Sequence, residues 1–183
     1  RNCLWRLAGL FDDPHIATVQ TPQNFYNPDA IQHNINVSNN WACEQELFFQ
    51  MVLPGRDALD AALCCGSCCM HRTAALRSVG GFPTSSITED ILLTVALVKR
   101  GWKTIYLREA TTMGLAAENL SSFFIQRQRW GRGNIQVGYQ VAQDKELSLK
   151  NKLLFFPFYW MIQHGSRAFF QLIPIVFFLS GIG

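Results

Sequence analysis

Charged side chains are scarce in this sequence. Asp, Glu, Lys and Arg make up only 16% of the 183 residues, and the formal net charge is +3. No basic stripe with interleaved aromatic residues is present, so we expect no nucleic acid partner. Internal repeats and low-complexity segments are absent too, which leaves one domain as the natural expectation for this length. Apolar residues take the place of charge, at 49% with fourteen phenylalanines, which is rich for a soluble protein.

The six cysteines lack a second pair of metal ligands. Cys65 and Cys68 form one C-x-x-C half-site with His71 close by, but no second C-x-x-C and no H-x-x-x-H follows. A structural zinc ion needs four ligands, typically arranged as two pairs. We therefore expect no metal site, and interpret the cysteines as small buried side chains with reduced thiols. A redox or metal role for the half-site is the alternative.

The order of apolar and helix-forming segments predicts alternating strands and helices. Strands are expected over residues 15–20, 63–70 and 102–107, and helices over residues 31–50, 73–79, 89–100 and 119–142. Within the last helix we expect a break at Gly131 to Gly133, because each glycine costs about 1 kcal/mol relative to alanine inside a helix. Such alternation is typical of an α/β domain with a largely parallel sheet.

Thr88, Glu89 and Asp90 begin one of these predicted helices. Threonine is a good N-cap, and acids in the first turn oppose the positive end of the helix dipole, so the tripeptide can be an ordinary helix start. It can also be catalytic. A carboxylate on the first turn, at the carboxyl edge of an α/β sheet, is well placed to take a proton from an attacking hydroxyl. The two interpretations are compatible.

A second polar motif, Q-x-x-R-W, follows 36 residues later. On a helix, Gln126, Arg129 and Trp130 share a face, and Arg127 lies beside them. Arginine binds phosphate through a planar fork of donors, and tryptophan offers an apolar plate on which a pyranose ring stacks. These side chains suit a phosphorylated sugar. The alternative is an amphipathic, arginine-rich surface helix.

Five short stretches together resemble one protein family. The stretches are Val19-Gln20-Thr21-Pro22, Cys65-Gly66-Ser67, Ile87-Thr88-Glu89-Asp90, Arg100-Gly101-Trp102 and Gln126-Arg127-Gln128-Arg129-Trp130. In order and approximate spacing they resemble the processive family 2 glycosyltransferases, the family of the cellulose synthases, over essentially the whole chain. Plant members carry long insertions between the Q-T-P and T-E-D regions. Only 65 residues separate Pro22 from Thr88 here, which fits the bacterial type better.

The resemblance implies roles for the residues around the T-E-D motif. Asp90 would be the general base that deprotonates the acceptor hydroxyl, with Glu89 and Thr88 as neighbours in that site. Cys65, Gly66 and Ser67 would form part of the wall around the acceptor.

The resemblance also implies roles for the Q-x-x-R-W motif. Arg129 and Arg127 would help to hold the nucleotide diphosphate. Trp130 would stack on the terminal sugar of the growing polymer, and Gln126 would line the same site.

For the whole protein, the resemblance implies an inverting transferase that extends a β-glycan from a nucleotide sugar, with UDP-glucose the expected donor. Related products, such as β-1,3-glucan, chitin or hyaluronan, are alternatives, as is a membrane scaffold with an inactive transferase domain.

The family holds Mg²⁺ through upstream aspartates that include a D-x-D pair, and no D-x-D occurs in this chain. We therefore interpret residues 1–150 as the C-terminal part of a cytosolic GT-A-type domain, and expect this fragment alone to be inactive.

Residues 151–183 carry the apolar excess. Residues 153–162 are too few for a span and include Pro157, so we expect an interfacial segment. Residues 168–183 reach only ~24 Å, short of a hydrocarbon core of about 30 Å, so we expect the start of a transmembrane helix. One long kinked helix, or buried helices of a soluble core, are alternatives. Lys145, Lys150, Lys152 and Arg167 precede the apolar end, and positive residues mark the cytoplasmic side, so we expect the catalytic domain in the cytosol. The resemblance implies a multi-pass protein of the inner (plasma) membrane, in contact with lipid.

Overall fold

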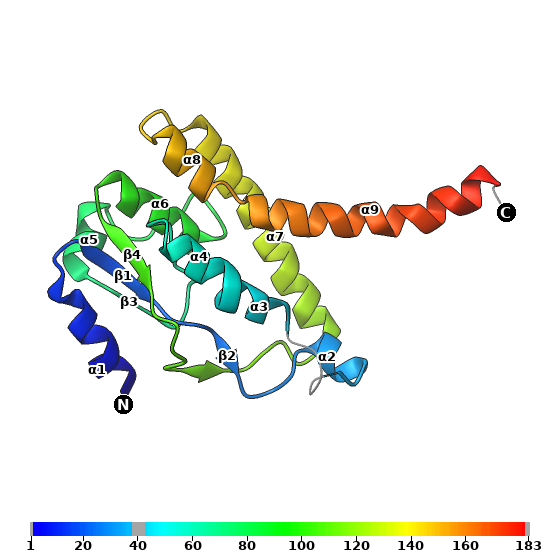
Figure 1. The fold of residues 1–183 in the computed structure, drawn as a ribbon, viewed down its shortest axis with the longest axis horizontal. Coiled ribbons are helices and arrows are strands. Elements are labelled where there is room, and N and C mark those ends of the chain that lie inside the picture. The colour runs from blue at the N-terminus through cyan, green and yellow to red at the C-terminus, as the bar shows by residue number, and fades with distance from the viewer. Residues whose placement is uncertain (1, 38–42, 182–183) are drawn as a thin grey trace.

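The chain folds into an α/β domain from which one long helix projects, as Figure 1 shows. The computed structural model describes residues 2–37 and 43–181. Helices make up most of the regular structure within these residues. They are α1 (Asn2–Ala8), the 3-10 helix η1 (Gly9–Asp12), α2 (Ala30–Asn34), α3 (Glu44–Leu47), the π-helical turn η2 (Phe48–Val52), α4 (Leu53–Asp57), α5 (Thr73–Ser78), α6 (Glu89–Lys99), α7 (Leu120–Gln143), α8 (Leu149–Phe155) and α9 (Phe158–Ser180).

A small mixed sheet forms the centre of the domain. Strand β1 (Ile16–Gln20) lies between β4 (Lys103–Tyr106), which runs parallel to it, and β3 (Cys69–His71), which runs antiparallel. A separate pair of short strands, β2 (Asn24–Phe25) and β5 (Met113–Gly114), is parallel. The strands predicted over residues 15–20 and 102–107 are confirmed as β1 and β4, and the sheet is mixed where a largely parallel one was predicted.

Strand β1 is buried along its whole length, so it anchors the core. Ala17 packs with Leu97 of α6 and Ala75 of α5, whereas Val19 packs with Leu7 of α1. Helices α1, α5 and α6 thus bury the central strand between them, and the predicted α/β class is confirmed. Another apolar cluster joins three helices to one another: Leu92 and Val95 of α6, Val137 and Val141 of α7, and Phe155 of α8.

Residues 63–70 do not form the single buried strand predicted from their apolar composition. Pairing with β1 begins only at Cys69, and the preceding residues form a loop. Gly66 and Cys68 have φ angles of 75° and 56°, which an extended strand does not allow. The loop therefore turns back over the sheet before it joins β3.

The helix predicted over residues 31–50 is also wrong as one element. Helix α2 ends at Asn34, and Asn36 follows with a φ of 54° in the left-handed region, which stops a right-handed helix. Residues 38–42 of the predicted helix lie outside the described residues. Helical structure begins again at Glu44 and continues to Asp57 through the π-helical turn. The helices predicted over residues 73–79 and 89–100 are confirmed as α5 and α6.

Helix α7 runs without the break that we predicted at its glycines. Gly131, Gly133 and Gly138 are buried, and each lies against a side chain from elsewhere in the chain. A Cβ at Gly131 would lie 2.9 Å from the Trp160 ring, and one at Gly138 would lie 3.3 Å from Pro157. The glycines therefore allow other segments to pack closely against the backbone of α7. This packing offsets the free energy that glycine costs within a helix.

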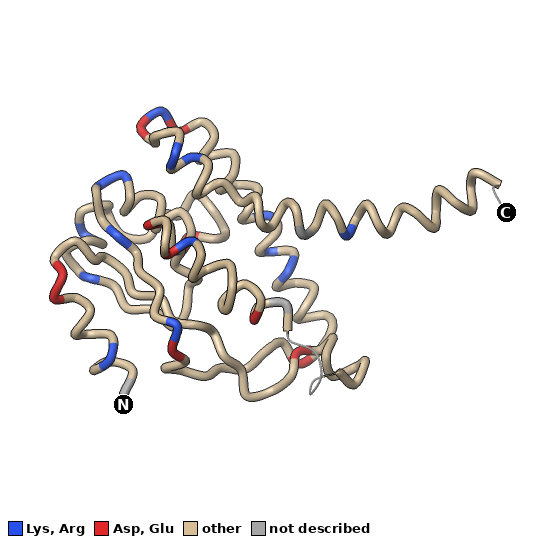
Figure 2. The backbone as a smooth tube through the Cα atoms, viewed as in Figure 1, with Lys and Arg blue, Asp and Glu red and all other residues tan. Residues whose placement is uncertain are grey.

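The C-terminal apolar segment is divided differently from our prediction. Helix α8 ends at Phe155, and one continuous helix, α9, then includes both the end of the predicted interfacial segment and most of the predicted span. Figures 1 and 2 show α9 extending away from the domain. In the sequence, Arg167 is the one Lys, Arg, Asp or Glu between Phe158 and Ser180. Phe178 and Leu179 are 80% and 82% exposed. In the described residues, none of the helices combines the length and hydropathy required to cross a bilayer.

The glycines of α7 give a direct test of the close approaches. A Cβ at Gly133 would overlap the methyl group of Thr88 and lie 2.8 Å from its Cβ. Gly133→Ala should therefore lower the free energy of unfolding by about 1–3 kcal/mol, the usual cost of overpacking. Gly165→Ala in α9 is the matched control, because no atom lies within 4 Å of its added Cβ, and it should be neutral or stabilising.

Thermal unfolding of the intact protein in detergent, compared between the two variants, measures this difference. Equal effects of Gly133→Ala and Gly165→Ala would contradict the contact between Thr88 and α7.

Candidate functional site

The T-E-D motif forms the first turn of α6, but Thr88 does not act as the predicted side-chain N-cap. Its hydroxyl hydrogen-bonds with Ser86 Oγ at 3.2 Å, and its side chain lies directly on the backbone of α7 at Gly133. Thr88 is buried. The residue is therefore used for packing two helices together, a task that competes with capping for the same side chain.

Asp90 lies at the bottom of this turn, mostly shielded from solvent. Its Oδ1 accepts a hydrogen bond from the Ile91 N–H at 2.9 Å, and its Oδ2 lies 3.1 Å from the point that a Cβ on Gly66 would occupy. Burial is the main cause that raises the pKa of Asp90 to about 6; the nearby Glu89 carboxylate acts in the same direction, whereas the Ile91 N–H and the Arg129 guanidinium act to lower the pKa. At neutral pH the carboxylate is ionised and more basic than an ordinary aspartate.

The loop of Cys65, Gly66 and Ser67 stands over Asp90 and is held from below by Gln20. Gln20 is fully buried in β1. Its Nε2 donates to the Ser67 carbonyl at 2.7 Å, and its Oε1 accepts from the Cys65 N–H at 2.8 Å. One side chain of the central strand therefore satisfies the backbone of the loop on both sides of Gly66.

Gln23 secures the same loop from outside. Its Nε2 lies 2.7 Å from both the Cys65 carbonyl and Ser67 Oγ. Gln23 also lines a cavity of about 470 Å³ formed with β2, α3 and η2. The cavity does not include Asp90, so it is adjacent to the candidate site without being its catalytic part.

Sequence reasoning assigned no role to Gln20 or Gln23. For Gln20 a signal was present, because a glutamine in a strand that is otherwise fully buried must find hydrogen-bond partners inside the protein. Gln136 of α7 was also missed. Its Oε1 accepts from the Ile87 N–H at 3.0 Å and from Ser86 Oγ at 3.2 Å, and so fastens the segment that leads into the T-E-D turn.

The Q-x-x-R-W residues occupy one face of α7, as predicted from their spacing. At about 100° per residue, Gln126, Arg129 and Trp130 all fall within roughly 60° of Gly133 around the helix. Gly133 touches Thr88, so this face is the one turned toward the T-E-D turn. Arg129 is exposed, and its charge is felt at Asp90 as a lowering of the carboxyl pKa.

Arg127 lies differently from the other members of the motif. Its guanidinium carbon is 4.6 Å from the centre of the Phe123 ring and 4.3 Å from the Trp130 ring. Such cation–π contacts favour this orientation of the indole. Arg127 therefore contacts Trp130, whereas Arg129 is the arginine whose charge lowers the pKa of Asp90.

Metal ligands for Mg²⁺ do not gather among the described residues. The one group there with metal-ligand spacing is Cys64, Cys69 and His71, which are sulfur and nitrogen ligands. Magnesium prefers oxygen ligands in octahedral geometry. These side chains therefore do not fit the expected Mg²⁺, and its ligands stay predicted upstream of Arg1.

Known proteins are similar to this chain over most of its length. Residues 1–182 match the model of the family described as glycosyl transferase family group 2. The chain belongs to this family, which confirms the resemblance inferred from its motifs.

Relatives named as cellulose synthases match most of the chain. It is 37% identical over 179 residues to the cellulose synthase catalytic subunit [UDP-forming] of Komagataeibacter sucrofermentans, covering 96% of the chain and 22% of that protein. It is 36% identical to the cellulose synthase 1 catalytic subunit [UDP-forming] of Komagataeibacter xylinus, covering 95% and 23%. A third catalytic subunit, from Xanthomonas axonopodis pv. citri, is 37% identical over 75% of the chain and 19% of its own length. The chain thus spans about a fifth of the length of these relatives.

Gln20 can be tested by an isosteric change. Gln20→Met keeps the length of the side chain but leaves the Cys65 N–H and the Ser67 carbonyl without their buried partner. Each unsatisfied group costs about 1–3 kcal/mol, so we expect a loss of roughly 2–4 kcal/mol in unfolding free energy. Gln23→Met is the control and should cost less, because its bonds lie at a partly exposed surface. Denaturant unfolding that ranks the two variants in the opposite order would contradict the clamp.

Proposed function

We propose that this chain forms the acceptor side of the active site in an inverting glycosyltransferase that extends a β-glucan from UDP-glucose. The observation that carries the proposal is the position of Asp90. A half-buried carboxylate with a raised pKa lies beneath a glycine and opposite a helix face that presents Arg129 and Trp130. General-base catalysis requires such a group, reachable by substrate and basic at neutral pH.

The proposed reaction is a single displacement. The acceptor hydroxyl oxygen attacks the anomeric carbon of the donor, and its proton passes to Asp90 Oδ2. The bond from that carbon to the diphosphate oxygen breaks, and the diphosphate leaves with the electron pair. Attack from the side opposite the leaving group inverts the anomeric configuration. Gly66 is necessary because any side chain there would press against Asp90 Oδ2.

The face of α7 would position both substrates. Trp130, held by Arg127, offers its ring as a platform for the terminal sugar of the polymer, and Gln126 borders the same surface. Arg129 is exposed and can pair with a diphosphate oxygen. A divalent ion, when bound by residues outside this chain, would neutralise charge on the leaving diphosphate. The names of these relatives, cellulose synthase catalytic subunit [UDP-forming], support glucan and UDP as the products.

Helix α9 supports a location at a membrane. Its apolar side chains are exposed over most of its length, from Phe169 to Leu179, and it extends away from the domain (Figure 1). Exposed apolar surface on this scale is favourable only against lipid or another apolar partner. We propose that α9 contacts lipid of the inner (plasma) membrane, with the α/β domain on the cytosolic side, where nucleotide sugars are made.

Asp90→Asn tests the assignment of the base. The amide keeps the size of the side chain and can still accept from the Ile91 N–H, but it cannot take a proton. We expect polymer synthesis by the intact enzyme to fall about 10²- to 10⁴-fold, with binding of UDP nearly unchanged. Glu89→Gln is the control, because it removes the neighbouring charge and keeps the proposed base. Near wild-type polymer synthesis by Asp90→Asn would rule out the role.

The pKa of Asp90 predicts opposite effects of pH on rate and on stability. The rate should rise with pH through about 6 as the base ionises. The same ionisation costs stability, because a carboxyl whose folded pKa is raised stabilises the fold when protonated, and that stability is lost as pH rises from about 4 to about 6. Asp90→Asn should therefore unfold at a higher temperature than wild type at pH 7.5, with the difference smaller at pH 4.5. A variant that is inactive and also less stable at pH 7.5 would indicate a structural aspartate.

A further inference from the structure

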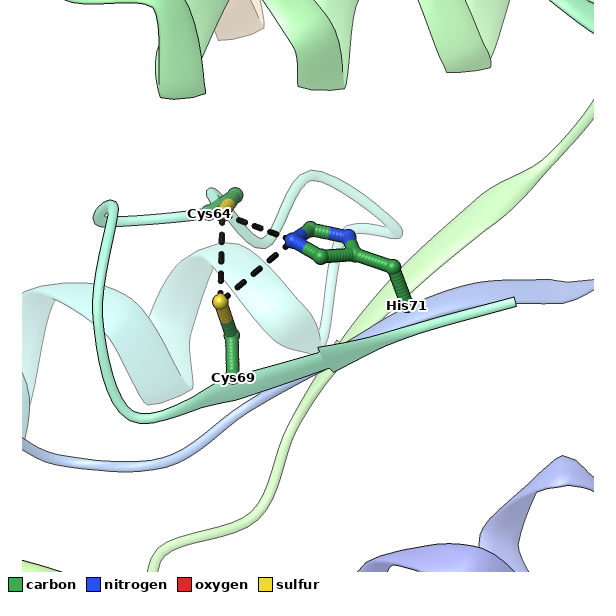
Figure 3. A group of neighbouring side chains, drawn as sticks. All are labelled: Cys64, Cys69 and His71. Carbon is green, nitrogen blue, oxygen red and sulfur yellow. Dashed lines mark hydrogen bonds between the residues drawn. The ribbon is translucent and has the colours of Figure 1, made fainter. Parts of the chain in front are cut away.

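Two cysteines and a histidine lie close together beside the sheet, although no metal-binding motif in the sequence contains all three. Figure 3 shows Cys64, Cys69 and His71 with their sulfur and nitrogen atoms turned toward one another. The two Sγ atoms are 3.7 Å apart, and His71 Nε2 lies 3.4 Å from the Sγ of Cys69 and 3.9 Å from that of Cys64. The group lies outside the transferase chemistry proposed above.

Strand geometry and the neighbouring loop create this group. Cys69 and His71 are two residues apart on β3, so their side chains leave the same face of the sheet. Between Cys64 and Cys69 the loop reverses direction through the left-handed conformations at Gly66 and Cys68. This reversal places Cys64 beside the same face of the sheet. The Cys64 N–H is fixed by Thr94 Oγ1 of α6 at 3.0 Å, so the third ligand is held by a helix.

The histidine is oriented as a metal ligand requires. The antiparallel register sets His71 opposite Thr18, and His71 Nδ1 lies 2.9 Å from Thr18 Oγ1. When Nδ1 carries the ring proton and donates it to this hydroxyl, Nε2 presents its lone pair to the two sulfurs. The ring also rests edge-on against Phe82, with 5.6 Å between centroids. Fixing one nitrogen by a hydrogen bond is the usual way in which proteins orient a ligating imidazole.

The separations match those around a tetrahedral zinc ion. With Zn–S near 2.3 Å and Zn–N near 2.0–2.1 Å, two sulfurs around the metal are about 3.8 Å apart and a sulfur and a nitrogen about 3.6 Å apart. The observed values of 3.7, 3.9 and 3.4 Å lie within about 0.3 Å of these. Two thiolates and a neutral imidazole would also cancel the two charges of the ion, which suits a site around the buried Cys64.

We propose that Cys64, Cys69 and His71 bind a thiophilic divalent metal ion of the zinc class, with solvent as the fourth ligand. Binding releases the two thiol protons to solvent and forms two metal–sulfur bonds and one metal–nitrogen bond. The assignment differs from the C-x-x-C half-site that the sequence suggests. Cys65 and Cys68 are not in the group, and the two cysteines that flank them are.

The metal would hold the loop that covers Asp90. Cys64 and Cys69 lie at its two ends, and between them Gly66 approaches Asp90 Oδ2. A metal bonded to both ends would restrict the positions that the loop can take. It would thereby hold Cys65, Gly66 and Ser67, the proposed wall around the acceptor, in place. This consequence rests on the proposed function, whereas metal binding itself does not.

Metal content of the intact protein tests the proposal without any measurement of sugar transfer. The protein is purified in detergent under reducing conditions, loaded with Zn²⁺, passed through a desalting column and analysed by elemental mass spectrometry. Cys64→Ser, Cys69→Ser and His71→Gln should each lose about one zinc per chain relative to wild type. Cys68→Ser is the matched control and should retain it. Replacing Zn²⁺ by Co²⁺ should give sulfur-to-cobalt charge-transfer absorption in wild type and Cys68→Ser, and not in Cys64→Ser or Cys69→Ser.

Thr18→Val separates ligation from simple loss of structure. The isosteric change removes only the hydroxyl that orients His71, and it should weaken zinc affinity about 10- to 100-fold while gel filtration stays unchanged. Equal zinc content in wild type and all three ligand variants would overturn the proposal. So would loss of zinc from Cys68→Ser to the same extent, or a Cys64–Cys69 disulfide as the state of the protein isolated without reductant. The zinc measurements do not depend on sugar transfer, so wild-type polymer synthesis by Asp90→Asn would contradict the proposed function without changing the expected zinc content.

Discussion

The contact between Thr88 and the backbone of α7 is the constraint on which the candidate site depends. Because Gly133 has no side chain, α6 and α7 meet closely enough for the T-E-D turn to face the Q-x-x-R-W residues. The far ends of the same helices are joined as well, since Lys99 Nζ lies 2.8 Å from Asp144 Oδ2. The ion pair lies near the surface and contributes little energy, so the apolar contacts between the helices supply most of the stabilisation. Geometry at Asp90 is therefore a property of helix packing.

The second support of the site is polar and comes from the sheet. Gln20 lies in the most buried strand, where an unpaired amide would be costly, and both ends of its amide bond to the loop over Asp90. The pairing ties the position of the loop to that of β1. Asp90 is thus enclosed between two elements that are fixed independently, the loop by the sheet and the turn by α7. Enclosure removes water that would stabilise the charged carboxylate. The protonated form is therefore favoured more than in solution, and the pKa of Asp90 is raised.

Sequence patterns predicted the parts of the fold where periodicity and end signals agree. Helix α6 begins at its acidic turn and ends before Gly101 as expected, and the face of α7 followed from the i, i+3 and i+4 spacing. Predictions failed where a residue type has more than one use. Apolar residues 63–68 were interpreted as a strand because composition does not reveal the positive φ of Cys68. The glycines of α7 were interpreted as a break because their contacts come from distant segments, and the group around His71 escaped notice because strand alternation and a loop reversal create it.

Helix α7 also connects the candidate site to α9 through a different face. Gly131 and Gly138 lie roughly 100° or more around the helix from Gly133, and they receive Trp160 and Pro157 from the start of α9. Trp130 falls between the two faces and precedes the glycine that Trp160 touches. The start of α9 therefore packs on the turn of α7 that carries Trp130, and the T-E-D turn packs on the next face of the same helix. Both contacts are made to backbone that has no side chain to yield, so α7 fixes the proposed sugar platform at Trp130, the turn that carries the proposed base Asp90 and the start of α9 relative to one another.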